Sequence, residues 1–310
     1  MAALDRLRGD DIAPLLAEEV AAWDQALNWD YRPSAELIDR FVRSEQLAGY
    51  ALLLRGKPIG YVYLVFEDRK TTIGGLFVSA AYRTARNEDL LLEAALAELF
   101  KTPGVRRVQA QLMLLDNPMT RPYPRAEWMR RYQREFMQAD LSAAAALEPV
   151  APRHAVYFEP WTTLCIDETA GLIARSYEGH VDARINDLYC TPAGSRKFLE
   201  NIVQYPGCGS FYQSGSFAAR DSATRRLVGT IMASVVSPEF GHVTQVCVHP
   251  SVQGTGLGYE LMRKSMVSMA ERGFKRVSLT VTSANPAIAL YRRMGFVERS
   301  PFAALVWDGF

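Results

Sequence analysis

The 310-residue sequence has few cysteines and few histidines, four of each. No Cys-x-x-Cys pair occurs, and no histidine stands at ligand spacing from a cysteine, which excludes a recognisable zinc motif or disulfide framework. We therefore expect reduced thiols, no bound metal and a cytoplasmic location. The cysteines are Cys165, Cys190, Cys208 and Cys247.

Long apolar runs and an excess of one charge are also lacking. No stretch approaches the ~20 apolar residues of a membrane span, and the first eleven residues lack the apolar core of a signal peptide. Lys and Arg number 35 against 34 Asp and Glu, a net charge of +1. This balance gives no electrostatic reason to expect a nucleic-acid or membrane partner.

The hydrophobic fraction of 49% and the charged fraction of 22% are typical of a globular protein, and the length allows two domains. One order of elements occurs twice, which predicts two tandem copies of one fold. In the first half we expect helices at 11–28, 34–44, 87–100 and 127–138, and strands at 50–54, 59–66, 71–78 and 105–115. In the second half we expect helices at 168–177, 193–203, 256–272 and 286–294, and strands at 217–220, 227–236, 242–248, 276–282 and 302–307. The predicted domains are 1–140 and 156–310, joined by a linker at 141–155 whose prolines 149 and 152 break any helix.

A glycine-rich loop lies between the strand at 242–248 and the helix at 256–272. Gly254, Gly256 and Gly258 leave the backbone without side chains just before a helix N-terminus. Unpaired N–H groups and the helix dipole favour an anion there, typically a pyrophosphate. A dinucleotide-binding fold would need Gly-x-Gly-x-x-Gly and an acidic residue about 20 positions on, but position 278 is Ser.

Around this loop the sequence resembles the GNAT superfamily of N-acetyltransferases, specifically over 242–296 and more loosely over 160–310. The matching positions are Val246, Val248, Pro250, Gln253, Gly256, Gly258, Asn285, Tyr291, Gly295 and Phe296. The resemblance implies an α/β (α+β) fold of two tandem GNAT-like domains, each a mixed, mostly antiparallel sheet flanked by helices. It also implies acetyl-CoA as co-substrate.

The resemblance further implies how acetyl-CoA binds. The pantetheine arm is expected between the strands at 242–248 and 276–282, which splay apart, and an amide near Val246 is expected to polarise the thioester carbonyl. Asn285 stands six residues before Tyr291, where the family commonly has seven. The implied cofactor-binding residues are Val246, Cys247, Val248, Gln253, Gly254, Thr255, Gly256, Leu257, Gly258, Tyr259, Asn285 and Tyr291.

Three groups are candidates for proton transfer and acceptor binding. Tyr291 is either the acid that protonates the leaving thiolate or a core aromatic residue. His242 is either the base or a histidine at a strand start, with its ring in water. Glu178, His180 and Asp182 either bind and deprotonate an ammonium group or belong to a solvated loop.

The first half does not carry the glycine loop. Thr84, Arg86 and Glu88 stand at the positions of the glycines, and their side chains would crowd or repel a phosphate. We therefore predict that residues 1–140 form a degenerate domain that does not bind the cofactor well. It covers the second half's sheet, or shapes the substrate cleft, or is only a packed structural partner.

The predicted function is acetyl transfer from acetyl-CoA to a primary amine of a small molecule or peptide, by direct attack in a ternary complex. No cysteine has the surroundings of an activated nucleophile, which disfavours an acyl-enzyme route. One alternative is transfer of another acyl group to a specialised acceptor. Another is a non-catalytic acyl-CoA-binding module. A monomer is preferred over a dimer, because two tandem domains can satisfy each other's sheet contact.

Overall fold

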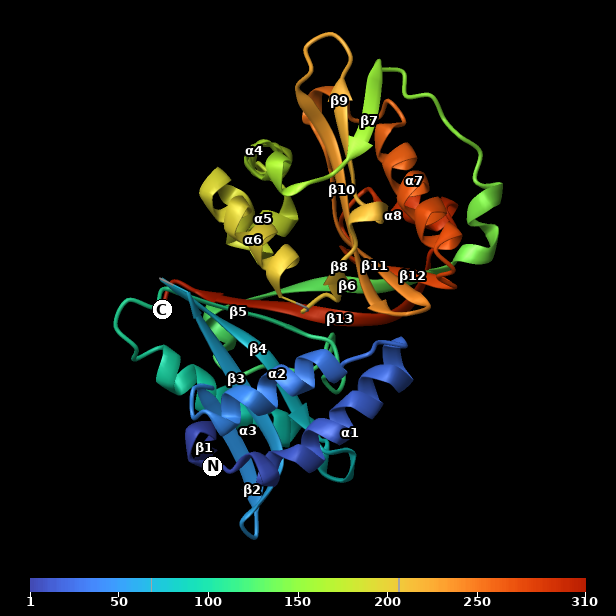
Figure 1. Cartoon of the computed structure of the whole chain (residues 1–310). Coiled ribbons are helices and arrows are strands. Elements are labelled where there is room, and N and C mark those ends of the chain that lie inside the picture. Colours follow the sequence, from blue (N-terminus) through green and yellow to red (C-terminus); the bar gives the residue numbers. More distant parts are fainter. Residues whose placement is uncertain (68, 206) are drawn as a thin grey trace. The chain divides into compact units, whose positions relative to one another are not determined.

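The computed structural model describes residues 1–67, 69–205 and 207–310 (Figure 1). The chain divides into two compact units, Met1–Glu135 with Ser300–Phe310, and Phe136–Arg299. The sequence instead predicts a linker at 141–155, and it predicts that residues 300–310 belong to the second domain. Strand β6 (Met129–Asp140) passes from the first unit into the second, and β13 (Val297–Asp308) returns.

The first unit is a mixed sheet with helices. Its strands follow the order β1-β2-β3-β4-β5-β13, and every neighbouring pair is antiparallel except β4 with β5. Its elements are β1 (Ala2–Ala3), α1 (Gly9–Leu27), α2 (Arg32–Arg43), β2 (Gly49–Leu54), β3 (Lys57–Glu67), β4 (Lys70–Val78), α3 (Ala85–Leu99) and β5 (Arg107–Leu112), with part of β6 and β13.

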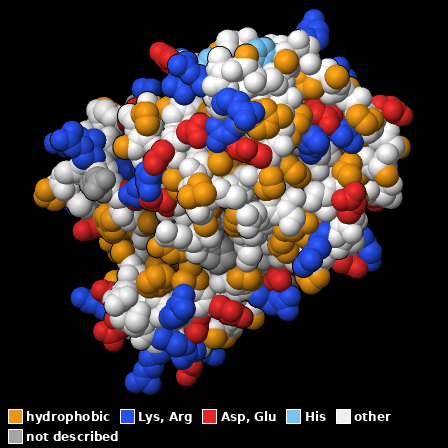
Figure 2. Space-filling view, turned by 45° about the horizontal axis from the view of Figure 1, so that its top comes forward, with side chains coloured by type: hydrophobic (Ala, Val, Ile, Leu, Met, Phe, Trp, Pro, Cys, Tyr) orange, Lys and Arg blue, Asp and Glu red, His pale blue; other side chains and the backbone are white. Residues whose placement is uncertain are grey.

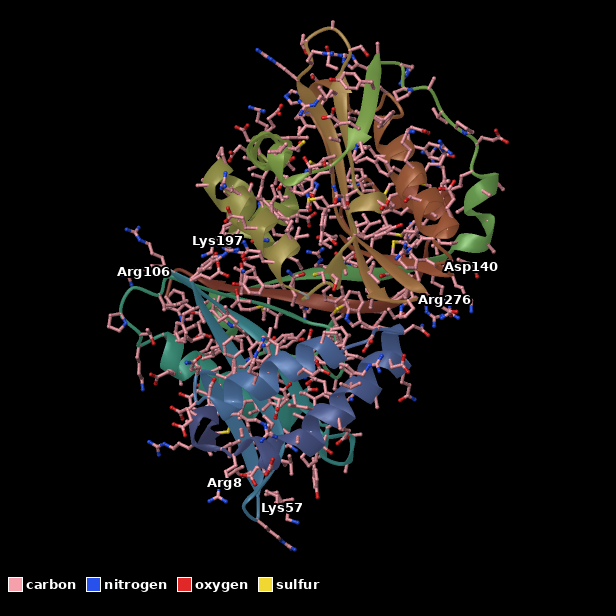
Figure 3. The ribbon with its side chains drawn as sticks, in the orientation of Figure 1. Arg8, Lys57, Arg106, Asp140, Lys197 and Arg276 are labelled. Carbon is pink, nitrogen blue, oxygen red and sulfur yellow. The ribbon has the colours of Figure 1, made fainter. Side chains whose placement is uncertain are left out.

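A two-residue hairpin joins β2 to β3, as the Arg-Gly-Lys-Pro sequence predicts. Arg55 and Gly56 have φ of 50° and 80°. Positive φ at both positions is the geometry of a type I′ turn, whose twist matches that of the flanking strands. Figure 3 shows Lys57 at this turn, with its side chain directed away from the sheet.

A carboxylate is buried between α1 and the sheet of the first unit. The side chain of Glu19 is 3% exposed, accepts a hydrogen bond from the Tyr61 hydroxyl, and accepts a second from Trp23 Nε1 at 3.3 Å. Burial raises the pKa of Glu19 from 4.5 to about 7, although the two hydrogen bonds act in the opposite direction. The neutral form is therefore the one that the fold favours.

We expect this group to make the first unit less stable as the pH rises. Because the folded-state pKa exceeds the unfolded value, Glu19 contributes most below pH 4.5, and its contribution falls as the pH approaches 7. The upper bound of the change is about 3 kcal/mol. Urea unfolding followed by tryptophan fluorescence at pH 5 and pH 8 measures it. Glu19→Gln should flatten the pH dependence, whereas Glu36→Gln, at an exposed position on α2, should not. An unchanged slope in Glu19→Gln would contradict this assignment.

The second unit has the same kind of sheet. Its strands follow the order β6-β12-β11-β10-β9-β7, with β8 beside β10, and β11 runs parallel to β12. Its elements are β7 (Val156–Pro160), α4 (Ile166–Ser176), α5 (Val181–Ile185), α6 (Pro192–Gln204), β8 (Ser210–Phe211), β9 (Phe217–Asp221), β10 (Leu227–Ser237), β11 (Phe240–Val248), α7 (Leu257–Glu271), β12 (Arg276–Thr282) and α8 (Ile288–Arg293).

Helices cover both faces of this second sheet. Figure 1 shows α4, α5 and α6 on one side, and α7 and α8 on the other. The residues of strand β12 show how the two faces differ. Val277, Leu279 and Val281 pack into the core under α7. In a strand the intervening residues face the opposite side, so Ser278 and Thr282 point toward α4 and α5. The predicted fold class, a mixed and mostly antiparallel sheet flanked by helices, is confirmed.

One predicted element is of the wrong type, and several have different bounds in the structure. The helix expected at 127–138 is wrong, because this segment forms β6. Its Arg, Glu, Gln and Met residues favour a helix, but 135–139 are all buried, and burial of successive residues suits a strand covered on both faces. The helix expected at 286–294 is shorter, Ile288–Arg293, and Asn285 Oδ1 accepts the N–H of Ala287 at 2.9 Å in the turn before it. Among the helices described, none is long and apolar enough to cross a membrane.

Candidate active site

Strands β11 and β12 separate at the end nearest to α7. Their parallel pairing begins at Phe240 with Arg276 and stops at Val243 with Leu279. At the same point the register of β11 against β10 shifts, since Met232 pairs with Gln245 and Ala233 with Val243, leaving Thr244 as an extra residue. A bulge bends a strand and locally increases its twist, so residues 244–248 diverge from β12.

The glycine loop follows the diverging part of β11. Gly254 and Gly256 have φ of 72° and 95°, which only glycine adopts without strain. Gly256 is the N-cap of α7, and within the described chain no side chain caps this helix. Gln253 Nε2 donates to Val248 O at 3.2 Å, and Thr255 Oγ1 donates to Val252 O at 2.7 Å. The first-turn amides of α7 therefore remain open to an anion.

The side chains of the predicted cofactor residues mostly pack against the protein. Val246 and Val248 pack on the α7 side, Leu257 is buried there, and Cys247 is buried on the opposite face with α4. Burial raises the pKa of the Cys247 thiol to about 12, so it stays protonated. Because these side chains are packed against the protein, a ligand at these positions would contact the main chain.

Tyr291 lies on α8 and is 7% exposed. Its ring contacts Phe296 edge-on, with the centroids 6.0 Å apart. Burial, and then the charge of Asp182, raise the pKa of the Tyr291 phenol. The phenol is therefore protonated at neutral pH, and it has both the packing of a core residue and a proton to donate.

Asp182 lies beside the end of β12, next to the opening between β11 and β12. It is 7% exposed and accepts a hydrogen bond from the Thr282 hydroxyl at the end of β12. His180 Nδ1 accepts the N–H of Asp182 at 3.1 Å and lies 3.6 Å from its carboxylate. On the β11 side, Gln245 Nε2 donates to Tyr177 Oη at 3.0 Å. Burial raises the pKa of Tyr177, and Tyr189 and then the charge of Asp182 act in the same direction.

The structure does not bring all of the predicted acceptor and base residues together. His180 and Asp182 are adjacent, but Glu178 is exposed. His242 is 4% exposed, with Nδ1 2.9 Å from Ser278 Oγ, so the expectation that its ring lies in water is wrong. The reason is the parallel register, which places His242 directly beside Ser278 on β12.

The corresponding loop of the first unit is built differently. Six residues separate Val78 from α3, whereas eight separate Val248 from α7. Thr84 caps α3, because its Oγ1 accepts the N–H of Asn87 at 3.2 Å. Here a side chain of the protein takes up a helix N–H group that the second unit leaves open.

The shorter loop also shifts the expected correspondence between the two halves. Counted from the helix starts, Glu88 matches Glu260 and not a glycine. Glu88 is 1% exposed and forms an ion pair with Arg121, so the expectation that its charge lies at an anion site is wrong.

The first unit keeps the separation of its strands, however, since β4 and β5 pair only up to Ile73 with Ala110. The ring of Tyr63 occupies the space beside Gly74, where an added Cβ would come within 2.1 Å of it.

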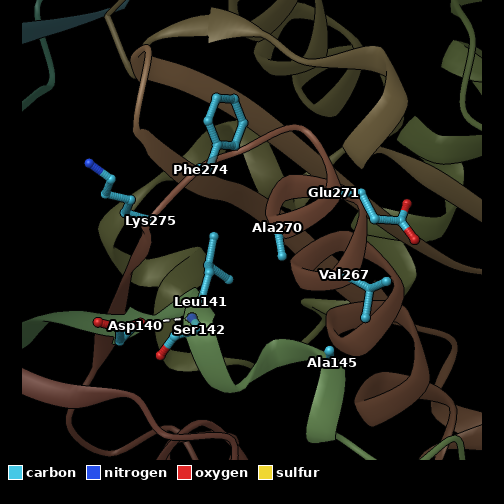
Figure 4. A pocket seen from close by; sticks show the side chains of 9 residues that line it. All are labelled: Asp140, Leu141, Ser142, Ala145, Val267, Ala270, Glu271, Phe274 and Lys275. Carbon is cyan, nitrogen blue, oxygen red and sulfur yellow. Dashed lines mark hydrogen bonds between the residues drawn. The ribbon is translucent and has the colours of Figure 1, made fainter.

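A surface hollow of about 600 Å³ lies at the other end of α7 (Figure 4). Its lining comes from the end of β6 with the segment after it, and from the end of α7 with the segment after that; it includes Asp140, Ser142, Glu271 and Lys275. Figure 3 shows Asp140 near Arg276 at this edge. Hydrogen bonds from Ser142, and then the charge of Arg276, lower the pKa of Asp140. Because the glycine loop is at the opposite end of the helix, we do not assign this hollow to the site.

The surface charge agrees with the balanced composition. Figure 2 shows Lys and Arg side chains intermixed with Asp and Glu, and with hydrophobic side chains, over the face in view. Such mixing provides no extended field of one sign on that face.

Comparison with known proteins agrees with this geometry. The sequence profile of the acetyltransferase (GNAT) family matches residues 184–296, which include β11, the glycine loop, α7, β12 and α8. The match thus covers the part of the second unit that carries the candidate site. A tandem GNAT protein from the clavulanic acid biosynthesis pathway has a similar structure, with a TM-score of 0.63 and 15% identity over 99% of this chain and 97% of that chain. This likeness supports the tandem GNAT fold.

The similar curated proteins are mycothiol acetyltransferases. The protein from Mycobacterium sp. (strain JLS) is 37% identical over 99 residues, which are 30% of this chain and 33% of that protein. The protein from Clavibacter sepedonicus is 28% identical over 225 residues, 71% of this chain and 68% of that protein. The alignment to the Mycobacterium relative thus spans about a third of its length.

Sequence reasoning missed several residues of the candidate site. Thr282 and Ser278 contact predicted residues, and the alternation of polar and apolar residues along β12 could have indicated their face. Tyr177 and Gln245 meet only through the tertiary fold, since 68 positions separate them. No local pattern identifies that contact.

Proposed function

We propose that the second unit transfers the acetyl group of acetyl-CoA to the primary amine of a small molecule. One observation supports this above all: β11 separates from β12 and leads, through a loop with two left-handed glycines, to a helix N-terminus that no side chain of the described residues caps. A separated strand edge can pair with the amides of a pantetheine arm, and the helix N-terminus can hold its diphosphate.

The main chain of β11 and α7 binds the co-substrate in this proposal. The backbone groups of Val246 and Val248 pair with the arm, and the amide near Val246 polarises the thioester carbonyl. Removal of one such preorganised donor typically costs about 3 kcal/mol of transition-state stabilisation. The amides around Gly256 and Gly258 hold the diphosphate, which the glycines allow to approach closely.

Asp182 and His180 prepare the amine. An alkyl ammonium, with a pKa of about 10 by analogy with lysine, must lose a proton before it attacks. The buried carboxylate of Asp182 binds the ammonium, and the pair relays its proton to water. His242 lies four residues before Val246, about 13 Å along an extended strand, so we place the relay at Asp182 and His180.

Tyr291 completes the reaction. As the new C–N bond forms and the C–S bond breaks, the phenol donates a proton to the leaving sulfur, and the second proton that the nitrogen loses returns to the phenolate through water. Its raised pKa keeps this proton in place at neutral pH. Because the Cys247 thiol is buried and protonated, attack by the amine is direct, without an acyl-enzyme.

The name of the similar curated proteins indicates which class of acceptor to expect. Their name, mycothiol acetyltransferase, favours a specialised small-molecule acceptor over a peptide. We propose that the first unit has a structural role, since Thr84 caps α3 and takes up a helix N–H group of the kind that would hold a phosphate. The chain therefore holds one acetyl-CoA.

We expect calorimetry to show one acetyl-CoA bound per chain, and CoA thiol release to depend on an added amine. A panel of small-molecule amines, with peptide N-termini and lysine side chains for comparison, should identify the acceptor class. Two bound molecules per chain would contradict the role given to the first unit. Tight binding without release for any amine would instead support a regulatory acyl-CoA-binding module.

A further inference from the structure

Residues 148–153, which we call the clasp, cross the N-terminal end of α7. The hydroxyl of Tyr259, in the first turn, donates to Glu148 O at 3.0 Å. The N–H of Val150 donates to Glu260 Oε2 at 3.2 Å, and Glu260 is itself held by Arg263 at 2.7 Å. The clasp is thus fixed to the helix by two hydrogen bonds.

The end of the clasp is fixed to the glycine loop. The N–H of Arg153 donates to Thr255 O at 2.9 Å, and the Arg153 guanidinium donates to Gly254 O. Val150 lies close to the N-cap, since a Cβ added at Gly256 would be 3.3 Å from its Cγ1. The loop that precedes α7 is therefore held from outside, by a segment a hundred residues earlier in the chain.

Arg153 has donors left for a ligand. A guanidinium carries five N–H groups, and the carbonyl of Gly254 engages one of its nitrogens. The side chain is exposed beside the loop. Planar N–H pairs match the oxygens of a phosphate, and such charge-assisted hydrogen bonds are about twice as strong as neutral ones.

We propose that Arg153 is a CoA-binding residue: anchored on Gly254, its guanidinium contacts a phosphate of the co-substrate, while the clasp holds the loop in its anion-binding conformation. This inference rests on the proposed function. It adds a positive charge beside the main-chain donors of the loop and of the first turn of α7.

The test compares two thioesters, acetyl-CoA and acetyl-pantetheine, of which the second has no phosphate. Arg153→Gln should raise the KM for acetyl-CoA about tenfold and leave kcat unchanged. It should not change kcat/KM for acetyl-pantetheine, and Arg153→Lys should recover part of the loss. Affinity for acetyl-CoA should also depend less on salt in Arg153→Gln, because one ionic contact is gone.

Arg272→Gln is the matched control. It removes one exposed positive charge just beyond the C-terminal end of α7, which is 15 residues long, so the change is about 22 Å from the loop. This variant should resemble the wild type with both thioesters. Equal losses with both thioesters in Arg153→Gln, or none with acetyl-CoA, would overturn the role of Arg153. A wild-type protein that binds no acetyl-CoA would instead overturn the proposed function.

Discussion

Tyr291→Phe is expected to lower kcat by about a hundredfold or more, the usual contribution of a positioned general acid. The phenylalanine ring keeps the contact with Phe296, so the α8 packing should persist. Without the phenol, the sulfur of CoA must leave as a thiolate or take its proton from water. Steady-state rates of CoA thiol release with a saturating amine measure the effect. Affinity for acetyl-CoA should be nearly unchanged.

The leaving group provides an independent check on this role. The thiolate of a more acidic thiol leaves with less help from proton transfer. With the acetyl thioester of such a thiol, the kcat of Tyr291→Phe should therefore come closer to the kcat of the wild type. Tyr212→Phe is the control, since it removes a phenol whose hydrogen bond to Ser268 O is long, at 3.4 Å. If Tyr291→Phe turns over at the wild-type rate, Tyr291 is a core residue only.

Gly258→Asp is expected to weaken acetyl-CoA binding by about a hundredfold, because it places a negative charge within a few ångström of the diphosphate. The fold should tolerate the change. A Cβ at Gly258 would meet Val248 and Leu290 at 3.7 and 3.8 Å, ordinary contact distances. A carboxylate in the first turn also interacts favourably with the helix dipole. Gly258→Asp should thus lower the affinity for acetyl-CoA and raise the free energy of unfolding.

Gly258→Asn separates charge from size. It has nearly the same volume as the aspartate but no charge, so it should lose much less affinity. Calorimetry with acetyl-CoA and urea unfolding of both variants supply the two measurements. Equal affinities in the Asp and Asn variants would show that no anion lies near the start of α7.

Much of the fold was predictable because its signals are local. The alternation along β12, the Arg55-Gly56 turn and the C-terminal end of α7 all follow from neighbouring residues. Gly273, for example, has φ of 94°, as expected of a glycine just after a helix. The strand at Met129–Asp140 was mispredicted because its residues favour a helix individually. Only burial between other elements makes it a strand.

The candidate site divides in the same way. By itself the sequence determined the glycine loop, its place between a strand and a helix, and Tyr291 in its helix, because these depend on spacing along a single stretch. The tertiary structure decided which polar groups meet: Asp182 with Thr282, His242 with Ser278, and Arg153 with the loop carbonyl of Gly254. These contacts join residues 36 to 101 positions apart. No repeating pattern in the sequence relates residues that far apart. Their contacts are set by the register of the strands and by the packing of the helices on the sheet.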